Sequence, residues 1–126
     1  MTATDPRATL GLQGETLAGA ALRRQGYAIL ATRYRTRRGE IDIVARDGAT
    51  LVFVEVKTRA SGARGTAREA VTAKKRQRLI AMATDYLARY HVTNAPVRFD
   101  VVAITTRPGE PPQIDILPGA FAADDR

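Results

Sequence analysis

The chain has 126 residues, 44% of them apolar, and its formal net charge is +7 at pH 7. This length predicts one domain over residues 1–126, long enough to bury a hydrophobic core. The sequence contains no cysteine, which excludes disulfide bonds and thiolate zinc sites and fits a cytoplasmic protein. No apolar run approaches the roughly 18 residues of a membrane span and no signal-peptide pattern is present, so we expect no membrane association.

The positive charge favours a polyanionic partner, because cationic side chains release the counterions bound to nucleic acid. Seventeen of the twenty basic residues are arginine. A GC-rich genome also produces a high arginine content without any binding role. The distribution of the charges along the chain is therefore a better guide to a binding site than the net charge.

The first expected element is a helix over about residues 10–25, preceded by a disordered segment at residues 1–8. Gly26 is placed to end the helix, because glycine readily adopts the left-handed conformation common after a last turn. A strand over residues 27–35 follows. The apolar stripe expected to be buried in the helix consists of Leu17, Ala18, Ala21 and Leu22.

Residues 39–44 and 51–57 alternate apolar and polar side chains with the period of two that is typical of strands with one buried face. Asp47-Gly48 between them is a strong two-residue turn signal, and a turn there pairs Ile43 with Val52. Successive side chains on a strand point to opposite faces. One face of the hairpin then carries Ile41, Ile43, Val52, Val54 and Val56, and the other carries Glu40, Asp42, Glu55 and Lys57.

Asp42 and Glu55 are diagonal neighbours in this register, about 7–8 Å apart at the backbone, and their carboxylates can converge on one ion. Mg²⁺ takes one or two carboxylates, and such an ion beside a lysine suits phosphodiester hydrolysis. Lys57 can act as a base or stabilise developing charge, and the sequence leaves both roles open. The alternative is a solvated hairpin face with an ordinary Glu–Lys pair, which the spacing alone does not exclude.

The run of Asp42, twelve further residues and Glu55-Val56-Lys57 resembles the D…(D/E)xK motif of restriction-endonuclease-like nucleases. Ile41 stands where many of those nucleases have proline. More closely, the chain resembles the YraN-like family of small bacterial proteins, which is similar to archaeal Holliday-junction resolvases. The resemblance covers about residues 10–117, and the segments that carry it are residues 11–15, 39–42, 53–57, the helix with Lys75, Arg78 and Leu79, and residues 98–102.

This resemblance implies an α/β, restriction-endonuclease-like fold with a mixed central β-sheet flanked by helices. It implies an endonuclease that uses Mg²⁺ or Mn²⁺ to cut DNA, with Asp42, Glu55 and Lys57 as catalytic residues. Glu15 matches the helical glutamate that contributes to the metal site of the resolvase-like relatives, beside Asp42 and Glu55. The alternative for Glu15 is an acidic residue that complements the positive end of a helix dipole.

Residues 59–68 are small, polar and rich in glycine, which predicts a mobile loop after the second hairpin strand. The loop either closes over a nucleic-acid backbone or is a flexible connection. A second helix is expected over residues 72–90, with Thr72 as its N-cap. At helical spacing it buries Leu79, Ala83, Tyr86, Leu87 and Tyr90.

The first turns of this second helix hold four cations, although the helix dipole disfavours positive charge there by about 0.3–1 kcal/mol each. These cations either meet a phosphate or form a solvated basic face. The residues expected to bind nucleic acid are Arg37, Arg38, Arg59, Lys74, Lys75 and Arg78.

Two further strands are expected, over residues 97–105 and 113–117, with residues 118–126 loose. The element order is α-β-β-β-α-β-β, and the crossover through the second helix makes one pair of strands parallel. Asp100 is expected to have a structural part. His91 lies near a helix C-terminus, where the dipole favours a cation.

Two functions from different classes fit these observations. The first is a metal-dependent endonuclease acting on DNA rather than RNA, with branched or otherwise structured DNA suggested by the resolvase similarity. Cutting a four-way junction would need two active sites and hence a homodimer. The second is a non-catalytic nucleic-acid-binding module on the same fold. Neither a Walker loop nor a GxGxxG fingerprint is present, which argues against chemistry driven by ATP or NAD.

Overall fold

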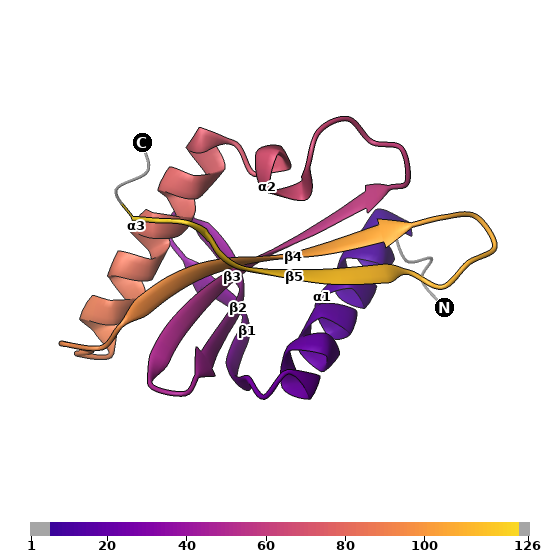
Figure 1. Cartoon of the computed structure of the whole chain (residues 1–126). Coiled ribbons are helices and arrows are strands. Elements are labelled where there is room, and N and C mark those ends of the chain that lie inside the picture. Colours follow the sequence, from indigo (N-terminus) through magenta and orange to yellow (C-terminus); the bar gives the residue numbers. More distant parts are fainter. Residues whose placement is uncertain (1–5, 124–126) are drawn as a thin grey trace, which may run out of the picture.

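The computed structural model describes residues 6–123, and it confirms the expected α/β fold with a mixed sheet flanked by helices (Figure 1). One short helix, α2, was not predicted from the sequence. In chain order the elements are α1 (Pro6–Arg24), β1 (Ala28–Thr36), β2 (Gly39–Asp47), β3 (Thr50–Ala60), α2 (Ala67–Ala70), α3 (Ala73–Arg89), β4 (Val97–Thr106) and β5 (Gln113–Phe121).

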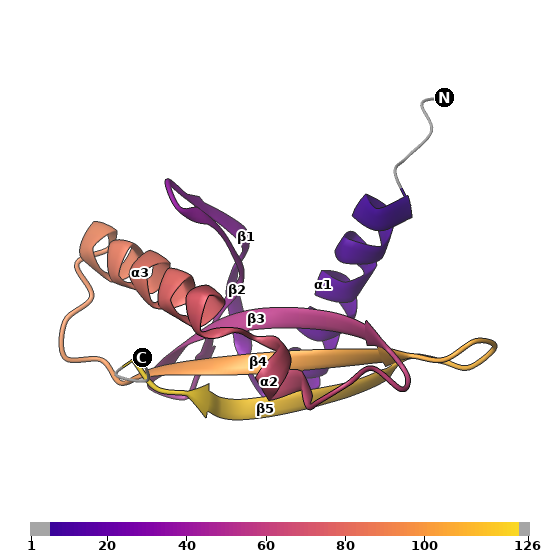
Figure 2. The same cartoon turned by 90° about the horizontal axis from the view of Figure 1, so that it is seen from above.

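The five strands form one sheet in the order β1-β2-β3-β4-β5. Neighbouring strands are antiparallel except β3 and β4, which are parallel and are joined by the crossover through α2 and α3. This confirms the parallel pair expected from the element order. Figure 2 shows the β1–β2 hairpin leaving the rest of the sheet between α3 and α1.

Helices cover both faces of the sheet, and each face has its own hydrophobic cluster. On one face Leu22 of α1 packs with residues such as Ile43 and Val54. On the other face Leu79 of α3 packs with residues such as Phe53. The expectation of a hairpin with a single buried face was therefore wrong, because strands between two helical layers bury apolar side chains on both sides.

The register of the central hairpin differs from the expected one by two residues. Ile43 pairs with Val54 rather than Val52, and Asp47 pairs with Thr50. The loop residues are thus Gly48 and Ala49, and Gly48 has φ of +60° at the first central position, as in type II′ turns.

A shift of two residues preserves the alternation, so Ile43, Val52 and Val54 remain on one face as expected. Ile41, however, packs in the cluster on the opposite face. The alternation therefore breaks at Asp42. Across from it on β1, Arg33 has φ of +52°, a left-handed conformation that interrupts a regular strand.

The ends of several elements differ from the sequence expectations. Helix α1 begins at Pro6, so residues 6–8 are helical rather than disordered, and β5 extends to Phe121 instead of ending at residue 117. Phe121 is buried against the α3 side of the sheet, which explains why the strand continues. Residues 1–5 and 124–126, expected to be disordered or loose, lie outside the described residues.

Helix α3 follows Thr72, whose side chain accepts a hydrogen bond from the Lys75 N–H, as expected of an N-cap. The expected burial of Tyr90 was wrong, since 51% of this residue is exposed. Met82 is buried instead and was missed. Tyr90 is the C-cap residue of the helix, and its ring packs beside those of Tyr34 and Tyr86 while about half of the residue stays exposed.

The glycine-rich segment after β3 is organised by Arg59. One nitrogen of its guanidinium, Nη2, donates hydrogen bonds to the carbonyl oxygens of Ala63 (2.8 Å), Arg64 (3.1 Å) and Gly65 (2.8 Å). Thr66 then caps α2 through a reciprocal capping box with Glu69. The residues expected to form only a loop thus include the start of a helix.

Asp100 is fully buried and joins distant parts of the fold, in line with its expected structural part. Its carboxylate accepts hydrogen bonds from the Tyr27 hydroxyl (2.8 Å), Arg98 Nε (2.8 Å) and the Gly119 N–H (2.9 Å). Arg98 Nη2 also donates to Asp47 at 3.0 Å. The network therefore links the start of β1, the end of β2, β4 and β5.

Within residues 6–123, no helix combines the length and the apolar character needed to cross a membrane.

Candidate active site between two strands

The candidate site lies where β2 separates from β3. The two strands pair from Asp47 and Thr50 as far as Ile43 and Val54, while β3 continues to Ala60 beside β4. Asp42 is the next residue on β2, and its Oδ2 accepts a hydrogen bond from the Val56 N–H at 2.8 Å. Its side chain thus satisfies a backbone donor in the gap between the strands.

Extending the observed register by one pair places Asp42 opposite Glu55, not opposite Phe53 as expected. The two residues therefore follow the last printed pair on their strands, and the two carboxyl groups are close enough for the charge of Glu55 to act on Asp42. Burial, and next the negative charge of Glu55, raise the pKa of Asp42 to about 7, although the hydrogen bond from Val56 acts in the opposite direction. The charges of Glu15 and Glu40 raise this pKa further.

Glu15 reaches the site because α1 lies very close to β3. A Cβ atom at Gly14 would be only 3.0 Å from Oγ1 of Thr58, so glycine permits this approach. Burial raises the pKa of Glu15, the charge of Arg33 lowers it, and the charge of Glu40 raises it. The structure thus brings Glu15 into the same group of carboxylates as Asp42.

Glu40 and Arg33 also belong to this group, and neither was among the catalytic, metal-binding or nucleic-acid-binding residues expected from the sequence. Arg33 Nε lies 3.8 Å from Glu15 Oε2 and 3.5 Å from Glu40 Oε2. Glu40 stands two residues before Asp42 in the motif at residues 39–42, which was the available signal. Arg33 holds a backbone conformation that is uncommon outside glycine, and such strain often gathers at functional sites.

Three cations surround Glu55 on the α3 side. Burial raises the pKa of this carboxyl, and the charges of Lys75, Lys57 and Arg78 lower it, in that order of size. Lys57 is half-buried on β3, whereas Lys75 and Arg78 are exposed on the first turns of α3. Two of the four cations in the first turns of α3 therefore act on the acidic site, whereas Arg76 donates to the carbonyl oxygens of Val71 and Arg68.

The other residues expected to bind nucleic acid lie elsewhere. Arg37 and Arg38 line a pocket between the β1–β2 hairpin and the end of α3, where Arg38 Nη1 is 2.9 Å from Asp85 Oδ2. Arg59 holds the loop after β3, and Lys74 is exposed on α3. Arg37 and Arg38 thus lie beside the end of α3 opposite to the turns that hold Lys74, Lys75 and Arg78.

In the described part of the chain, no three His, Asp or Glu side chains already stand in the arrangement of a metal site. The donor chemistry nevertheless fits a hard divalent cation, because Mg²⁺ uses one or two carboxylates and keeps several waters. The raised pKa of Asp42 fits as well, since a cation would relieve the repulsion between the partly buried carboxylates. Asp42 and Glu55 would hold such an ion, with Glu15 as a third acidic group.

Comparison with known proteins places the chain in a family. A family profile described as "Uncharacterised protein family UPF0102" matches residues 14–104, which include all the acidic residues of the site. A UPF0102 protein of Anaeromyxobacter dehalogenans is 48% identical over 122 residues, which cover 97% of this chain and 90% of the relative. UPF0102 proteins of Geobacter metallireducens and Pseudomonas aeruginosa are 50% and 49% identical, and in each case the match covers 90% of this chain and 92% of the relative. The chain therefore belongs to the UPF0102 family, which confirms the family-level resemblance seen in its sequence motifs.

Proposed function

We propose that the protein is an endonuclease that uses Mg²⁺ or Mn²⁺ to hydrolyse phosphodiester bonds in DNA that is branched or otherwise structured. The observation that carries this proposal is the pair of neighbouring carboxylates, Asp42 and Glu55, with three cations beside Glu55. Carboxylates alone repel a phosphate, and cations alone do not hold a metal ion. Both together suit a phosphate that is attacked next to a metal ion.

Each residue then has a defined part. When bound, the metal ion polarises the phosphate and lowers the pKa of a water molecule. Asp42 and Glu55 bind the ion, and Asp42 must lose its proton to do so. Lys75 and Arg78 attract the phosphate from the exposed side.

Of the three cations, Lys57 is the closest to Glu55 in the sequence: it lies two residues later, on the same face of β3. Its ammonium group either stabilises the charge that develops on the phosphate or orients the attacking water through a hydrogen bond. Both parts require the ammonium to stay close to Glu55.

The choice of substrate rests on resemblance. The D…(D/E)xK spacing and the similarity of the YraN-like family to archaeal Holliday-junction resolvases favour DNA over RNA, and structured DNA over simple duplex. Cutting both sides of a junction would require a homodimer.

A non-catalytic nucleic-acid-binding module is the second candidate, and the exposed cations on α3 are the observation that favours it. In that case the carboxylates would have a structural role, and DNA would bind without being cut.

The test is a cleavage assay on single-stranded, duplex, flap and four-way-junction DNA with Mg²⁺, Mn²⁺ or EDTA, with binding measured in parallel. We expect cutting with either metal and none with EDTA. Glu55→Gln should abolish cutting and leave DNA binding intact. Glu110→Gln is the matched control, since Glu110 is an exposed glutamate in the β4–β5 turn.

Cleavage that survives in both Asp42→Asn and Glu55→Gln would overturn the site assignment. Binding that never leads to cutting, with either metal and on all four substrates, would favour the second candidate.

A further inference from the structure

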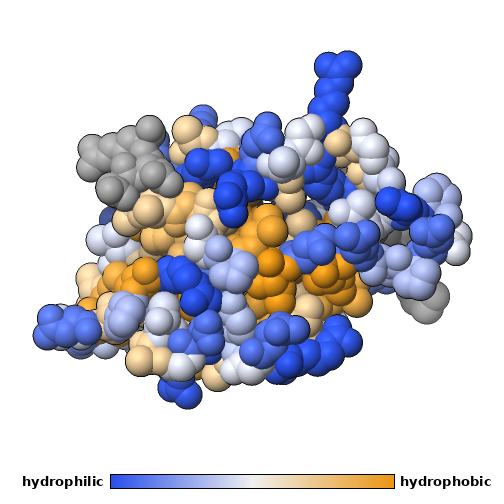
Figure 3. Space-filling view, in the orientation of Figure 1, coloured by the Kyte–Doolittle hydropathy of each residue, from blue (hydrophilic) through white to orange (hydrophobic). Residues whose placement is uncertain are grey.

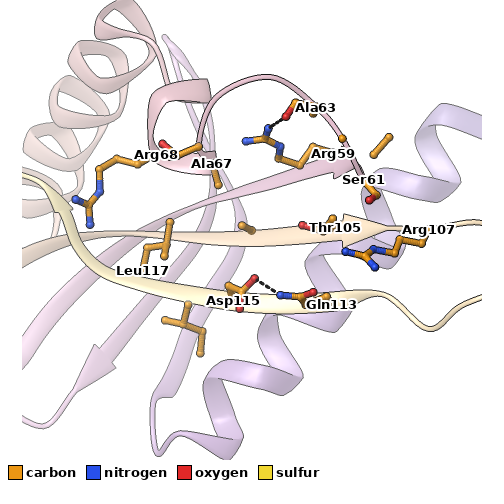
Figure 4. A pocket seen from close by; sticks show the side chains of 15 residues that line it. Arg59, Ser61, Ala63, Ala67, Arg68, Thr105, Arg107, Gln113, Asp115 and Leu117 are labelled. Atoms are coloured by element: carbon orange, nitrogen blue, oxygen red, sulfur yellow. Dashed lines mark hydrogen bonds between the residues drawn. The ribbon is translucent and has the colours of Figure 1, made fainter.

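A separate pocket of about 660 Å³ lies on the same face of the sheet as Lys57. The segment after β3 and the start of α2 cover it, and β4 and β5 form its floor (Figure 4). Lys57 pairs with Ala103 on β4, and Ala103 pairs with Asp115 on β5. Asp115 is therefore two strands away from Lys57, about 10 Å at the backbone.

The pocket combines positive charge with an apolar floor. Arg59, Arg68 and Arg107 line it, against the single carboxylate of Asp115. Figure 4 shows Arg68 and Arg107 at opposite ends, with Asp115 between them. Apolar side chains such as Leu117 complete the lining, and Figure 3 shows apolar surface over the middle of β5 with hydrophilic side chains around it.

The arginines differ in what they can offer a ligand. Nη2 of Arg59 already donates to three backbone carbonyls of the loop, so this side chain shapes the wall. Arg68 and Arg107 are exposed, and guanidinium groups bind phosphate oxygens in a bidentate manner. The two ends of the pocket therefore suit phosphates.

The centre of the pocket suits the edge of a base. Asp115 Oδ2 accepts a hydrogen bond from Gln113 Nε2 at 3.1 Å, and both residues are exposed. A carboxylate can accept further hydrogen bonds from the amino group of a base such as cytosine. Leu117 offers an apolar contact for the flat face of the ring.

We propose that this pocket binds one unpaired nucleotide of the DNA strand that passes the Asp42–Glu55 site, with its phosphates on Arg68 and Arg107 and its amino-bearing base edge on Asp115. This proposal rests on the proposed function, from which it takes the path of the DNA strand past the Asp42–Glu55 site. A paired cytosine still offers one amino hydrogen in the major groove, but its ring is stacked between its neighbours, so the ring can lie on Leu117 only when the base is unpaired and leaves the stack. The pocket therefore selects DNA with unpaired nucleotides close to the cut, within about three nucleotides at 3.4 Å each.

The test measures binding in EDTA, where no cutting is expected, so that it does not depend on catalysis. Three labelled DNA duplexes are compared by fluorescence anisotropy: fully paired, with one unpaired cytosine, and with one unpaired thymine. We expect the cytosine duplex to bind roughly tenfold more tightly than the paired duplex, as one good base contact allows. The thymine duplex should bind more weakly than the cytosine duplex, because thymine has no amino group.

Asp115→Asn should remove the preference for cytosine over thymine. Glu110→Gln makes the same change of charge on the same hairpin outside the pocket lining, and should keep that preference. Arg107→Gln should weaken binding of both unpaired duplexes more than of the paired one. Arg64→Gln is its control, an arginine of the same covering loop that does not line the pocket.

Equal affinity of the wild type for all three duplexes would overturn the proposal, as would an unchanged cytosine preference in Asp115→Asn. Titration with free deoxycytidine monophosphate tests the alternative that the pocket binds a free nucleotide as a small ligand. A free nucleotide that binds at Asp115 without any preference among the duplexes would assign the pocket to a small ligand and overturn the role in strand recognition. A protein that prefers unpaired cytosine but never cuts DNA would support the pocket and count against the nuclease only.

Discussion

Asp42 and Glu55 lie together where the pairing of β2 with β3 ends, and burial together with the charge of Glu55 raises the pKa of Asp42 to about 7. Two carboxylates in this position cost the metal-free fold free energy whenever both are ionised. This cost is a reason to expect a bound cation at the site. It also means that changes at the site alter the free energy of unfolding, which can be measured.

The first prediction concerns pH. The folded pKa of Asp42 lies above its ordinary value of 3.8, so between about pH 4 and pH 7 the folded state keeps a proton that the unfolded chain has lost. The free energy of unfolding then falls as pH rises through this window. Asp42→Asn removes the titration, and its amide oxygen can still accept the Val56 N–H.

We expect Asp42→Asn to raise the free energy of unfolding by up to about 4 kcal/mol at pH 8, and by little at pH 4. Urea denaturation without metal at several pH values measures the difference between variant and wild type. A difference that is the same at pH 4 and pH 8 would show that Asp42 is not buried among carboxylates.

The second prediction concerns the metal ion. Because an ion bound only to the folded state stabilises it, Mn²⁺ at about ten times its Kd should raise the free energy of unfolding by about 1.4 kcal/mol. The gain should shrink from pH 8 to pH 6, since Asp42 must lose its proton on binding. Thermal unfolding with and without Mn²⁺ measures it, and Glu55→Gln should lose the gain while Glu110→Gln keeps it. Equal gains in both variants would place the ion elsewhere.

The third prediction concerns Arg33, whose guanidinium lies beside Glu15 and Glu40. A metal ion must compete with this cation for the acidic group. Arg33→Asn should therefore tighten Mn²⁺ binding by roughly two- to fivefold, in line with the modest energy of exposed ion pairs. Asparagine also tolerates the left-handed backbone at this position.

Calorimetric titration of Mn²⁺ measures this affinity. Arg35→Asn is the control, because Arg35 contacts Glu40 at 3.2 Å from a side chain that is 86% exposed. Weaker Mn²⁺ binding in Arg33→Asn would mean that the arginine holds the carboxylates in place for the metal.

The fourth prediction concerns the cations beside Glu55. Replacing Lys75 or Arg78 by Gln should weaken DNA binding regardless of sequence and reduce the slope of log K against log salt by up to about 0.9 per lost phosphate contact. Arg89→Gln, at the far end of α3, should leave the slope unchanged if DNA binds at the site alone. Slopes that do not change in Lys75→Gln and Arg78→Gln would remove this helix end from the interface.

The fifth prediction concerns the buried Asp100. Removing one partner of a buried charged network leaves the other charge uncompensated, so Asp100→Ala should lower the free energy of unfolding by about 3–5 kcal/mol. Tyr27→Phe removes one hydroxyl of the same network and should cost about 1–2 kcal/mol. Urea denaturation measures both variants. A loss below about 1 kcal/mol in Asp100→Ala would contradict a structural role.

Local signals in the sequence were sufficient for most elements. Thr72 caps α3 through its hydroxyl, and Gly26, which has no side chain to hinder a left-handed conformation, follows α1 with φ of +91°; both were expected. The crossover between β3 and β4 made a parallel pair the expected outcome. The helix ends depend on residues close together in the sequence, and the parallel pair depends on the order of the elements. Both kinds of information are present in the sequence.

The sequence by itself determined which residues are candidates for the site, because Asp42, Glu55 and Lys57 stand in a motif and Glu15 in another. Only the tertiary structure decided how they meet. The choice of Gly48 as the first turn residue shifted the register and placed Asp42 opposite Glu55, and the close approach of α1 at Gly14 brought Glu15 to them. The contacts of Arg33 with Glu15 and Glu40, and the pocket around Asp115, also emerged only there, because pairing across strands and the packing of helices join residues that no spacing along the chain relates.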